Sequence, residues 1–512
     1  MAETKPNVIY IYADDLGRGM LGCYGQQLLE TPNIDRLRRG GMMFNRMYGC
    51  HICAPARASL ICGVHDCHNG RWTFTRAGLY KDYARGTLPL SKVFELINNT
   101  GIEQKAGDVF LPMVFKQAGY CTGQIGKLEW GFATTGDEIK KHGWDYHYGY
   151  YDHEMCHGFF PPFLFENGVP DVFPQNREVD CGASRFEKHM KDPSVPLMEE
   201  GEVYSQDMFD EKICAYIEKH RDGPFFLFHP SQLPHGLLSI PQIDPRVEHR
   251  GDFTKMEKVY ASMVLRLDNT VGLIMDTLEK FNLTEKTMVI FAADNGHECY
   301  YQSERTGFPD NFNIRGEAVD HLNVRYTSED YGDIFDGNDG LTGKKTTNFE
   351  GGTRIPFIVR WPGVVAENSI CDRMAANYDF LSTIADMLGA DEGFGKDGIS
   401  YLPLLTGNEN NFAGHDYVVY AGGRGPALIT KDGWKIRTHF KNLQFPYWFI
   451  VPDQIVFELY NTADDPREEN NLAEKFPQKL EELRLLLFKE CDGSLFNGMM
   501  QPHFAFYSSD YA

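Results

Sequence analysis

Short runs of β-branched and aromatic residues, separated by stretches with helical spacing, are the feature that most narrows the fold of this chain. The clearest strand candidates are residues 8–12, 225–228, 288–291 and 357–360. Apolar residues also recur at helical spacing over 259–278, which predicts a long amphipathic helix. Apolar strands that alternate with helices are typical of a parallel sheet buried on both faces. We therefore predict an α/β fold in which helices sandwich a large, mainly parallel sheet.

The pattern changes after about residue 410. Short strand candidates at 417–420, 427–430, 434–437 and 456–460 are followed by one helical stretch near 479–489. That order predicts a smaller α+β subdomain that contains an antiparallel sheet. Because 512 residues exceed one simple core, we predict a large domain over 1–410 and a small one over 411–512.

The charge balance limits the partners of the chain. Lys and Arg total 50 against 72 Asp and Glu, a net charge of −22, which argues against nucleic acid and anionic membrane surfaces as partners. No segment approaches the unbroken apolar stretch of a membrane helix, so no membrane span is expected. An anionic substrate would need a local group of Lys, Arg, His or metal to overcome the acidic field.

The cysteines and the N-terminal residues allow a prediction of the cellular compartment. Twelve cysteines are scattered without paired spacing, which favours a reducing compartment over a disulfide framework. The N-terminus runs straight into the first strand candidate without a basic region, an apolar core or a cleavage site. The sequence as written therefore predicts a cytoplasmic location, or a periplasmic one if a signal peptide was removed.

Acidic residues follow two of the strand candidates. Asp14 and Asp15 come after 8–12, and Asp294 and Asn295 come after 288–291. Ligands bind outside the carboxyl ends of strands in open parallel sheets, so we expect these side chains at one edge. Three carboxylates and an amide oxygen would repel one another without a cation, and all-oxygen ligation favours Ca²⁺, or Mg²⁺, over zinc. The alternative is that the aspartates are ordinary turn and helix-cap residues.

The segment from Cys53 to Gly63 reads Cys-Ala-Pro-Ala-Arg-Ala-Ser-Leu-Ile-Cys-Gly. Cys-x-Pro-x-Arg followed by Thr-Gly is the signature of sulfatases that oxidise the cysteine to formylglycine, and this segment closely resembles it. Cys62 stands where the family usually has Thr, at a position that we expect to pack. The alternative is a buried structural thiol at Cys53, which fits poorly with Pro55 and Arg57 at this spacing.

Other motifs follow the order of the same family along nearly the whole chain. They are Asp14-Asp15, Thr31-Pro-Asn-Ile-Asp35, Gly126-Lys127, Pro234-His235, Asp294-Asn295-Gly296, Lys345 with Glu350-Gly-Gly-x-Arg354-x-Pro356, and Asp465-Pro-Arg-Glu-Glu-Asn-Asn-Leu472. The chain thus resembles the formylglycine-dependent (type I) sulfatases of the alkaline-phosphatase-like superfamily, and bacterial glycan sulfatases among them. The resemblance implies the fold of that superfamily.

The resemblance also implies roles for single residues. The expected metal ligands are Asp14, Asp15, Asp294 and Asn295, with converted Cys53 completing the shell. The groups expected to bind sulfate and transfer protons are Lys127, His235 and Lys345, and Arg57 is expected to hold the formylglycine hydrate. Cationic donors and a Lewis acid suit a sulfuryl group, because its negative charge must be stabilised as the bond breaks. Of the two candidate acids, we expect His235 to donate the proton, because the ordinary pKa of histidine lies near neutrality, and Lys345 to bind sulfate.

One departure follows Lys127. Many relatives have Lys-Trp-His or Lys-Trp-Gly there, whereas this chain reads Lys-Leu-Glu129-Trp-Gly. Glu129, His157 or His297 are therefore candidates to contact the substrate instead. His157 lies in a segment similar to one near the substrate of bacterial glycan sulfatases, and His297 directly follows the metal motif. The alternative for both histidines is a hydrogen-bonded position in the core.

The implied reaction removes sulfate from a small sulfated substrate, which we expect to be a saccharide. Aromatic segments at 146–151, 159–165 and 445–449 are candidates to stack on sugar faces. The implied partner is a maturase that generates formylglycine. Two alternatives stay open: a phosphonate or phosphate monoester hydrolase of the same superfamily, and a catalytically silent protein that binds sulfated glycans.

Overall fold

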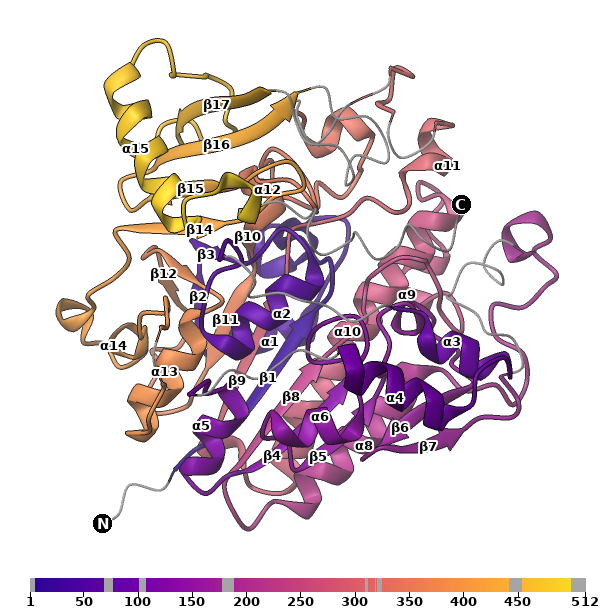
Figure 1. Ribbon diagram of the computed structural model, residues 1–512. Coiled ribbons are helices and arrows are strands. Elements are labelled where there is room, and N and C mark those ends of the chain that lie inside the picture. The colour runs from indigo at the N-terminus through magenta and orange to yellow at the C-terminus, as the bar shows by residue number, and fades with distance from the viewer. Residues whose placement is uncertain are drawn as a thin grey trace.

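A ten-stranded sheet forms the centre of the fold (Figure 1), in a computed structural model that describes residues 5–68, 77–100, 107–176, 188–308, 312–317, 319, 325–393, 395–441 and 454–498. The strand order is β12-β2-β11-β9-β1-β8-β4-β5-β6-β7. In that order the strands are Ser369–Cys371, Met42–Phe44, Phe357–Arg360, Thr287–Ala293, Asn7–Ala13, Phe225–Pro230, Cys121–Gly126, Tyr146–Gly149, Phe163–Glu166 and Val169–Val172.

The central strands β9, β1, β8, β4 and β5 all run parallel. Antiparallel pairs flank them, where β11 meets β9 and where β6 and β7 close the far edge. The prediction of a mainly parallel sheet is confirmed, and the four strand candidates of the large domain lie within β1, β8, β9 and β11. The last of these runs antiparallel to its neighbours.

Helices cover both faces of the sheet. On one face α10 (Lys255–Lys280) packs against α1 (Pro32–Arg39) and α8 (Ser205–Lys219). On the other face α2 (Cys53–Cys62), α5 (Leu111–Gln117) and α13 (Asp379–Leu388) contact one another. The predicted helix over 259–278 lies inside α10, which begins with a capping box in which Thr254 and Glu257 bond each other's backbone amides.

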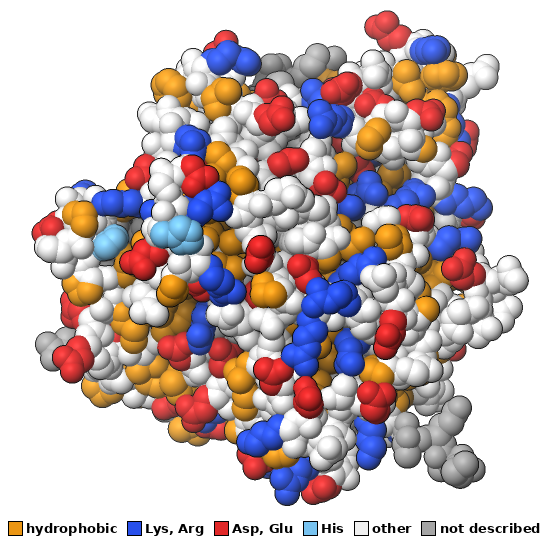
Figure 2. Space-filling view, turned by 180° about the vertical axis from the view of Figure 1, so that it is seen from behind, with side chains coloured by type: hydrophobic (Ala, Val, Ile, Leu, Met, Phe, Trp, Pro, Cys, Tyr) orange, Lys and Arg blue, Asp and Glu red, His pale blue; other side chains and the backbone are white. Residues whose placement is uncertain are grey.

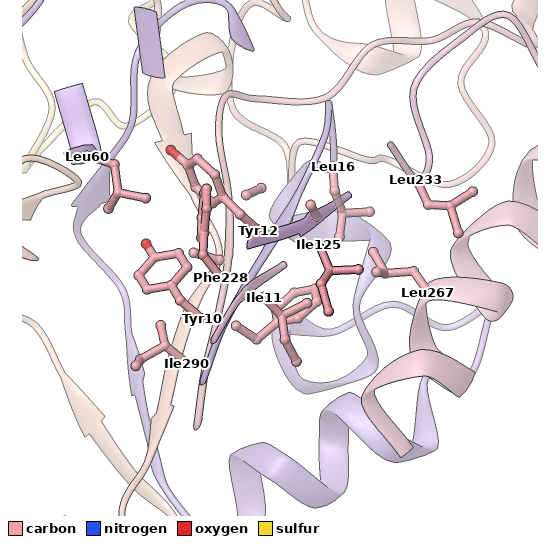
Figure 3. Close-up of a cluster of buried hydrophobic side chains, with 14 of the residues drawn as sticks. Tyr10, Ile11, Tyr12, Leu16, Leu60, Ile125, Phe228, Leu233, Leu267 and Ile290 are labelled. Atoms are coloured by element: carbon pink, nitrogen blue, oxygen red, sulfur yellow. The ribbon is translucent and has the colours of Figure 1, made fainter. Parts of the chain in front are cut away.

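Alternate residues of β1 face the two helical layers (Figure 3). Tyr10 and Tyr12 lie on the same side as Leu60 of α2, whereas Ile11 lies on the side of Leu267 of α10. All five side chains are at most 1% exposed. Burial on both faces explains why this strand reads as a continuous apolar run instead of an alternating one.

The C-terminal part forms the predicted antiparallel sheet. Its strands are β14 (Tyr417–Tyr420), β15 (Ala427–Thr430), β16 (Trp434–Lys441) and β17 (Gln454–Asn461), and α15 (Pro477–Glu490) packs on them. A three-stranded sheet of β10 (Arg354–Ile355), β3 (Met47–Tyr48) and β13 (Ala375–Ala376) adjoins it. There the ring of Tyr48 stacks on that of Tyr420, with 5.9 Å between centroids. The boundary near residue 410 stays a prediction.

The acidic net charge does not make the surface uniformly acidic. Figure 2 shows Lys and Arg side chains gathered toward the middle of one face, with acidic side chains among them. None of the described helices is both long and apolar enough to cross a membrane.

Candidate active site

The neighbouring parallel strands present polar residues where each strand ends. Because β9, β1, β8, β4 and β5 are parallel, the segments that follow them meet at one edge of the sheet. In strand order these segments carry Asp294 and Asn295, Asp14 and Asp15, His235, Lys127, and lastly His153 and His157.

Three buried carboxylates form the centre of this group of polar residues at the sheet edge. Asp14, Asp15 and Asp294 each offer an oxygen within 4.8 Å of the others. Asp294 Oδ1 accepts hydrogen bonds from the backbone amides of Asp15 (3.0 Å) and Asn295 (2.9 Å). Burial, and then the negative charge of Asp14, raises the pKa of Asp294 well above its usual range. Asp14 Oδ1 and Asn295 Oδ1 are buried and accept no hydrogen bond from the described residues. These unpaired oxygens fit a divalent cation that prefers oxygen ligands.

Two buried cations lie against the carboxylates. The Arg57 guanidinium is 3.1 Å from Asp14 Oδ2 and 3.3 Å from Asp294 Oδ2, and the Lys127 ammonium bonds Asp14 Oδ2 as well. Burial alone would raise the pKa of Asp14, but Lys127 and Arg57 hold it well below its usual range. Asp14 is therefore ionised, and the local positive charge that an anionic substrate requires is present.

Cys53 is the first residue of α2 and is 1% exposed. The extended backbone of Ile52 precedes it, so the helix begins where Pro55 predicts a helix start. Arg57 lies one turn along the same helix. The Cys53 thiol lies within 4.8 Å of ligand atoms of Asp14 and His235, which places it beside the carboxylates. Burial raises the pKa of this thiol, so it is protonated at neutral pH.

Lys345 joins the group from the loop before α12 (Glu350–Thr353). Its ammonium donates to Asp15 Oδ2 (2.7 Å), His235 Nε2 (2.9 Å) and the Tyr300 hydroxyl (3.3 Å). Burial lowers the pKa of Lys345, but Asp15 raises it above its ordinary value, so the ammonium stays charged. Burial and then Lys345 lower the pKa of His235 to about 4. This corrects the expectation of a near-neutral pKa for His235.

Backbone geometry around the carboxylates is specialised. Asp15 (φ 62°) and Thr346 (φ 73°) adopt the left-handed region that residues with a side chain rarely occupy. Gly296 must be glycine, because a Cβ there would lie 1.7 Å from the carbonyl oxygen of Gly351. Its amide donates to the Gly352 carbonyl at 2.9 Å. The Asp294-Asn295-Gly296 segment and the loop that carries Lys345 are thus fixed to each other.

Comparison with known proteins identifies the family of this chain. The sulfatase family model matches residues 6–390, and a model described as the C-terminal part of N-sulphoglucosamine sulphohydrolase matches residues 337–490. The chain belongs to the sulfatase family. The resemblance read from the sequence motifs is confirmed.

This sulfatase has named relatives and solved neighbours. It is 27% identical to N-acetylgalactosamine-6-O-sulfatase of Bacteroides thetaiotaomicron, over 95% of this chain and 93% of that one. A Bacteroides thetaiotaomicron structure from work on glycosaminoglycan metabolism has a TM-score of 0.69 at 22% identity and covers 96% of this chain and 100% of its own. The phosphonate monoester hydrolase of Agrobacterium radiobacter has a TM-score of 0.57 at 16% identity, with 95% of each chain covered. Both structures share the fold of this sulfatase.

Two of the sequence-based candidates lie outside the group. Both carboxylate oxygens of Glu129 are engaged, by His142 Nδ1 and Trp144 Nε1, and Glu129 is fully buried. The ring nitrogens of His297 lie 2.8 Å and 3.2 Å from the hydroxyls of Tyr301 and Tyr260. Burial and hydrogen bonds occupy the polar atoms of Glu129 and His297, so both side chains pack in the core. This corrects the expectation that they contact the substrate.

His157 lies inside the group, as the sequence suggested. It is half-buried, and its ring stacks on that of His235 with 4.2 Å between centroids and an interplanar angle of 7°. Sequence reasoning missed two other members. Tyr300, whose hydroxyl bonds Asp15 Oδ2, gives no signal beyond its place five residues after Asn295. His153 lies four residues before His157 in the segment already singled out, and that spacing was the signal that could have found it.

The aromatic segments mostly pack. Tyr151 stacks on Phe165 (centroids 4.2 Å apart, 5° between planes), and Phe159 stacks on Tyr204. All four side chains are buried. Stacking on a sugar is therefore not the role of these residues, and the segment 445–449 lies outside the described residues.

Proposed function

We propose that this sulfatase removes sulfate from a sulfated sugar, with formylglycine made from Cys53 as nucleophile and Ca²⁺ or Mg²⁺ beside it. One observation carries the proposal: Cys53 lies against three buried carboxylates and two buried cations at the carboxyl ends of the central strands. The relative that is an N-acetylgalactosamine-6-O-sulfatase supports a sugar as the substrate class.

The metal would be held by the side-chain oxygens of Asp14, Asp15, Asp294 and Asn295. Two of these residues have unpaired buried oxygens, Asp14 Oδ1 and Asn295 Oδ1, which supports their assignment. A bound Ca²⁺ or Mg²⁺ supplies a Lewis acid for the sulfuryl oxygens. Arg57 and Lys127 then balance the remaining negative charge of the carboxylates.

Formylglycine supplies a hydrated aldehyde whose hydroxyl is the nucleophile. The ammonium groups of Lys127 and Lys345 bind the sulfuryl oxygens, because both lie at the carboxylate group and both stay charged. His235 accepts a hydrogen bond of 2.9 Å from the Lys345 ammonium and is the group that delivers a proton to the leaving alcohol, whereas Lys345 binds sulfate. Because His157 stacks on His235 and is half-buried, it contacts the sugar at the open side of the group.

Conversion of Cys53 requires a partner, a maturase that generates formylglycine. The experiment is to produce the protein with and without such a maturase and to measure the mass of the peptide that contains residue 53. We expect formylglycine and sugar-sulfate hydrolysis only with the maturase. Cys53→Ala should fold and lose turnover, whereas Cys121→Ala, at an exposed cysteine, should keep it. Full activity of Cys53→Ala would contradict the proposal.

A second candidate is hydrolysis of phosphonate or phosphate monoesters, favoured by the shared fold of the Agrobacterium radiobacter phosphonate monoester hydrolase. The same cations suit a phosphoryl dianion. We expect kcat/KM to be higher on an aryl sulfate than on an aryl phosphonate, and the reverse order would favour this candidate. If Cys53 stays a thiol with a competent maturase present, a silent glycan-binding protein becomes the better description.

A further inference from the structure

One histidine next to the candidate nucleophile has no place in the reaction described so far. His153 Nε2 lies 3.8 Å from Cys53 Sγ, a hydrogen-bonding distance for sulfur. His153 comes from the segment after β5, whereas Cys53 begins α2, so two distant parts of the chain bring these atoms together. Both side chains are buried.

A network of backbone hydrogen bonds fixes the segment that carries His153. The buried carboxylate of Asp152 accepts from the amides of Gly78 (3.0 Å), Tyr80 (3.2 Å), Glu154 (2.8 Å) and Met155 (3.2 Å). The amide of His153 itself donates to the Phe132 carbonyl at 2.8 Å. The backbone therefore holds this histidine in place before any substrate is present.

Only one ring nitrogen of His153 has a hydrogen-bonding partner among the described residues, although ligand atoms of Cys156 and His157 also lie within 4.8 Å. Phe132 packs edge-on against it with 5.0 Å between centroids, and His157 packs edge-on at 4.7 Å. His153 Nδ1 is buried and has no hydrogen-bond partner among the described residues. Nε2, in contrast, faces the side chain of residue 53. A neutral imidazole carries one proton, and an orphaned N–H is costlier than a bare nitrogen, so the proton belongs on Nε2.

We infer that His153 is a further catalytic residue, which donates its Nε2 proton in a hydrogen bond to a hydroxyl of the hydrated formylglycine at position 53. The inference rests on the proposed function. It also accounts for the missing histidine after Lys127, because Glu129 is turned into the core at that place. A histidine from the segment after β5 fills the position beside the nucleophile instead.

The hydrogen bond has a consequence that does not depend on turnover. A donor at this position favours the hydrate over the free aldehyde, because the hydrate has two hydroxyl oxygens, whereas the aldehyde has one oxygen to share between His153 and the neighbouring cations. The readout is the rate at which an aldehyde-specific alkoxyamine labels the converted protein without any sulfated substrate. We expect His153→Phe to raise this rate about fivefold per converted chain, the equivalent of one net hydrogen bond. Phe keeps the volume of the ring, so easier access does not explain faster labelling.

The matched variants are His153→Gln, which keeps a donor at similar reach, and His249→Gln at an exposed histidine. We expect both to label within about twofold of wild type, and turnover of a sugar sulfate to fall at least about tenfold in His153→Phe alone. The peptide mass at residue 53 normalises every rate to converted protein. Should His153→Phe fail to fold, His153→Leu takes its place in the comparison.

The outcomes separate the inference from the proposed function. Wild-type protein without formylglycine, made with a competent maturase, would overturn the proposed function and the inference with it. Converted wild type that turns over, with His153→Phe unchanged in labelling rate and turnover, would overturn the inference alone. Slower labelling in His153→Phe would overturn it as well, because the hydrate would then not depend on this donor.

Discussion

Asp14 and Asp294 lie in one buried group, yet their pKa values move in opposite directions. Burial raises both, but Lys127 and Arg57 act mainly on Asp14, whereas Asp294 mainly feels the charge of Asp14. Lys127 and Lys345 pair with Asp14 and Asp15, whereas among the described residues only Arg57 lies against Asp294. At the scale of single residues, Asp294 is therefore the carboxylate whose ionised form is stabilised least, and a bound divalent cation would lower its pKa.

His235 and Lys345 differ in how they should respond to substitution. A general acid matters most when the leaving alcohol is poor, because an activated phenol departs with little help. We expect His235→Ala to lower kcat/KM far more on a sugar sulfate than on an aryl sulfate, and Lys345→Ala to lower both about equally. Measurement of kcat/KM on both substrates checks this, and equal losses for His235→Ala would reject His235 as the acid.

At the scale of elements, the strand and helix patterns in the sequence predicted most of the fold. Strand candidates 417–420 and 427–430 match β14 and β15 residue for residue. The edge strand β12 and its neighbour β2, of three residues each, were not predicted, because so short a run has no periodicity to read. The antiparallel direction of β11 depends on how the chain returns to the sheet, which local sequence does not encode.

Some residues of the candidate site could likewise be predicted from the sequence, and others could not. Residues at strand ends, such as Asp14 and Asp294, could be predicted because parallel strands gather their carboxyl ends. Which histidine lies next to Cys53 could not, because the turn after β5 decides between His153 and His157. The position of Glu129 after Lys127 suggested a contact with the substrate, but its carboxylate is buried against His142.

A buried ionic group joins the C-terminal antiparallel sheet to the start of α12. Lys435 of β16 is fully buried, with Nζ 3.1 Å from Glu350 Oε1 and 2.8 Å from Glu468 Oε1. Replacing it by Met removes the cation from two buried carboxylates and leaves Glu350 with Arg354 at 3.8 Å, so we expect Lys435→Met to lower the free energy of unfolding by about 3–5 kcal/mol. Lys431→Met is the control, because Lys431 pairs with Asp416 in solvent and should change little. Denaturant unfolding of both variants tests this, and equal losses would contradict it.

His415 makes the stability of the α13 region depend on pH. Burial lowers the pKa of His415, but Asp379, 2.6 Å from its Nε2, raises it above the ordinary 6.5. A raised histidine pKa stabilises the fold fully below the unfolded value and loses that contribution as the pH rises through the folded value. We expect His415→Gln to lower Tm more at about pH 5.5 than at about pH 9. The exposed His249→Gln is the control, and an equal or larger Tm loss at high pH would contradict the argument.

At the scale of the whole molecule, the net charge of −22 and the local cations have different roles. Figure 2 shows basic side chains mixed with acidic ones on one face, so that face carries no single sign. The charge that suits a sulfate ester is inside, on Lys127 and Arg57, where little water screens it. The parallel sheet makes this possible, because Lys127 follows β4 at the edge where Arg57 of α2 also lies.

Cation binding at that edge should stabilise the entire fold, since the ligands come from segments far apart in the chain. Adding Ca²⁺ at a hundredfold excess over Kd should raise the free energy of unfolding by about 2.7 kcal/mol, and a chelator should remove the gain. We expect Asp294→Asn to lose this response and, in chelator, to be at least as stable as wild type, because the substitution removes a buried like charge. Asp252→Asn, at an exposed aspartate, should keep the wild-type response. Thermal unfolding with and without Ca²⁺ measures both, and a full Ca²⁺ response in Asp294→Asn would mean that the cation binds elsewhere.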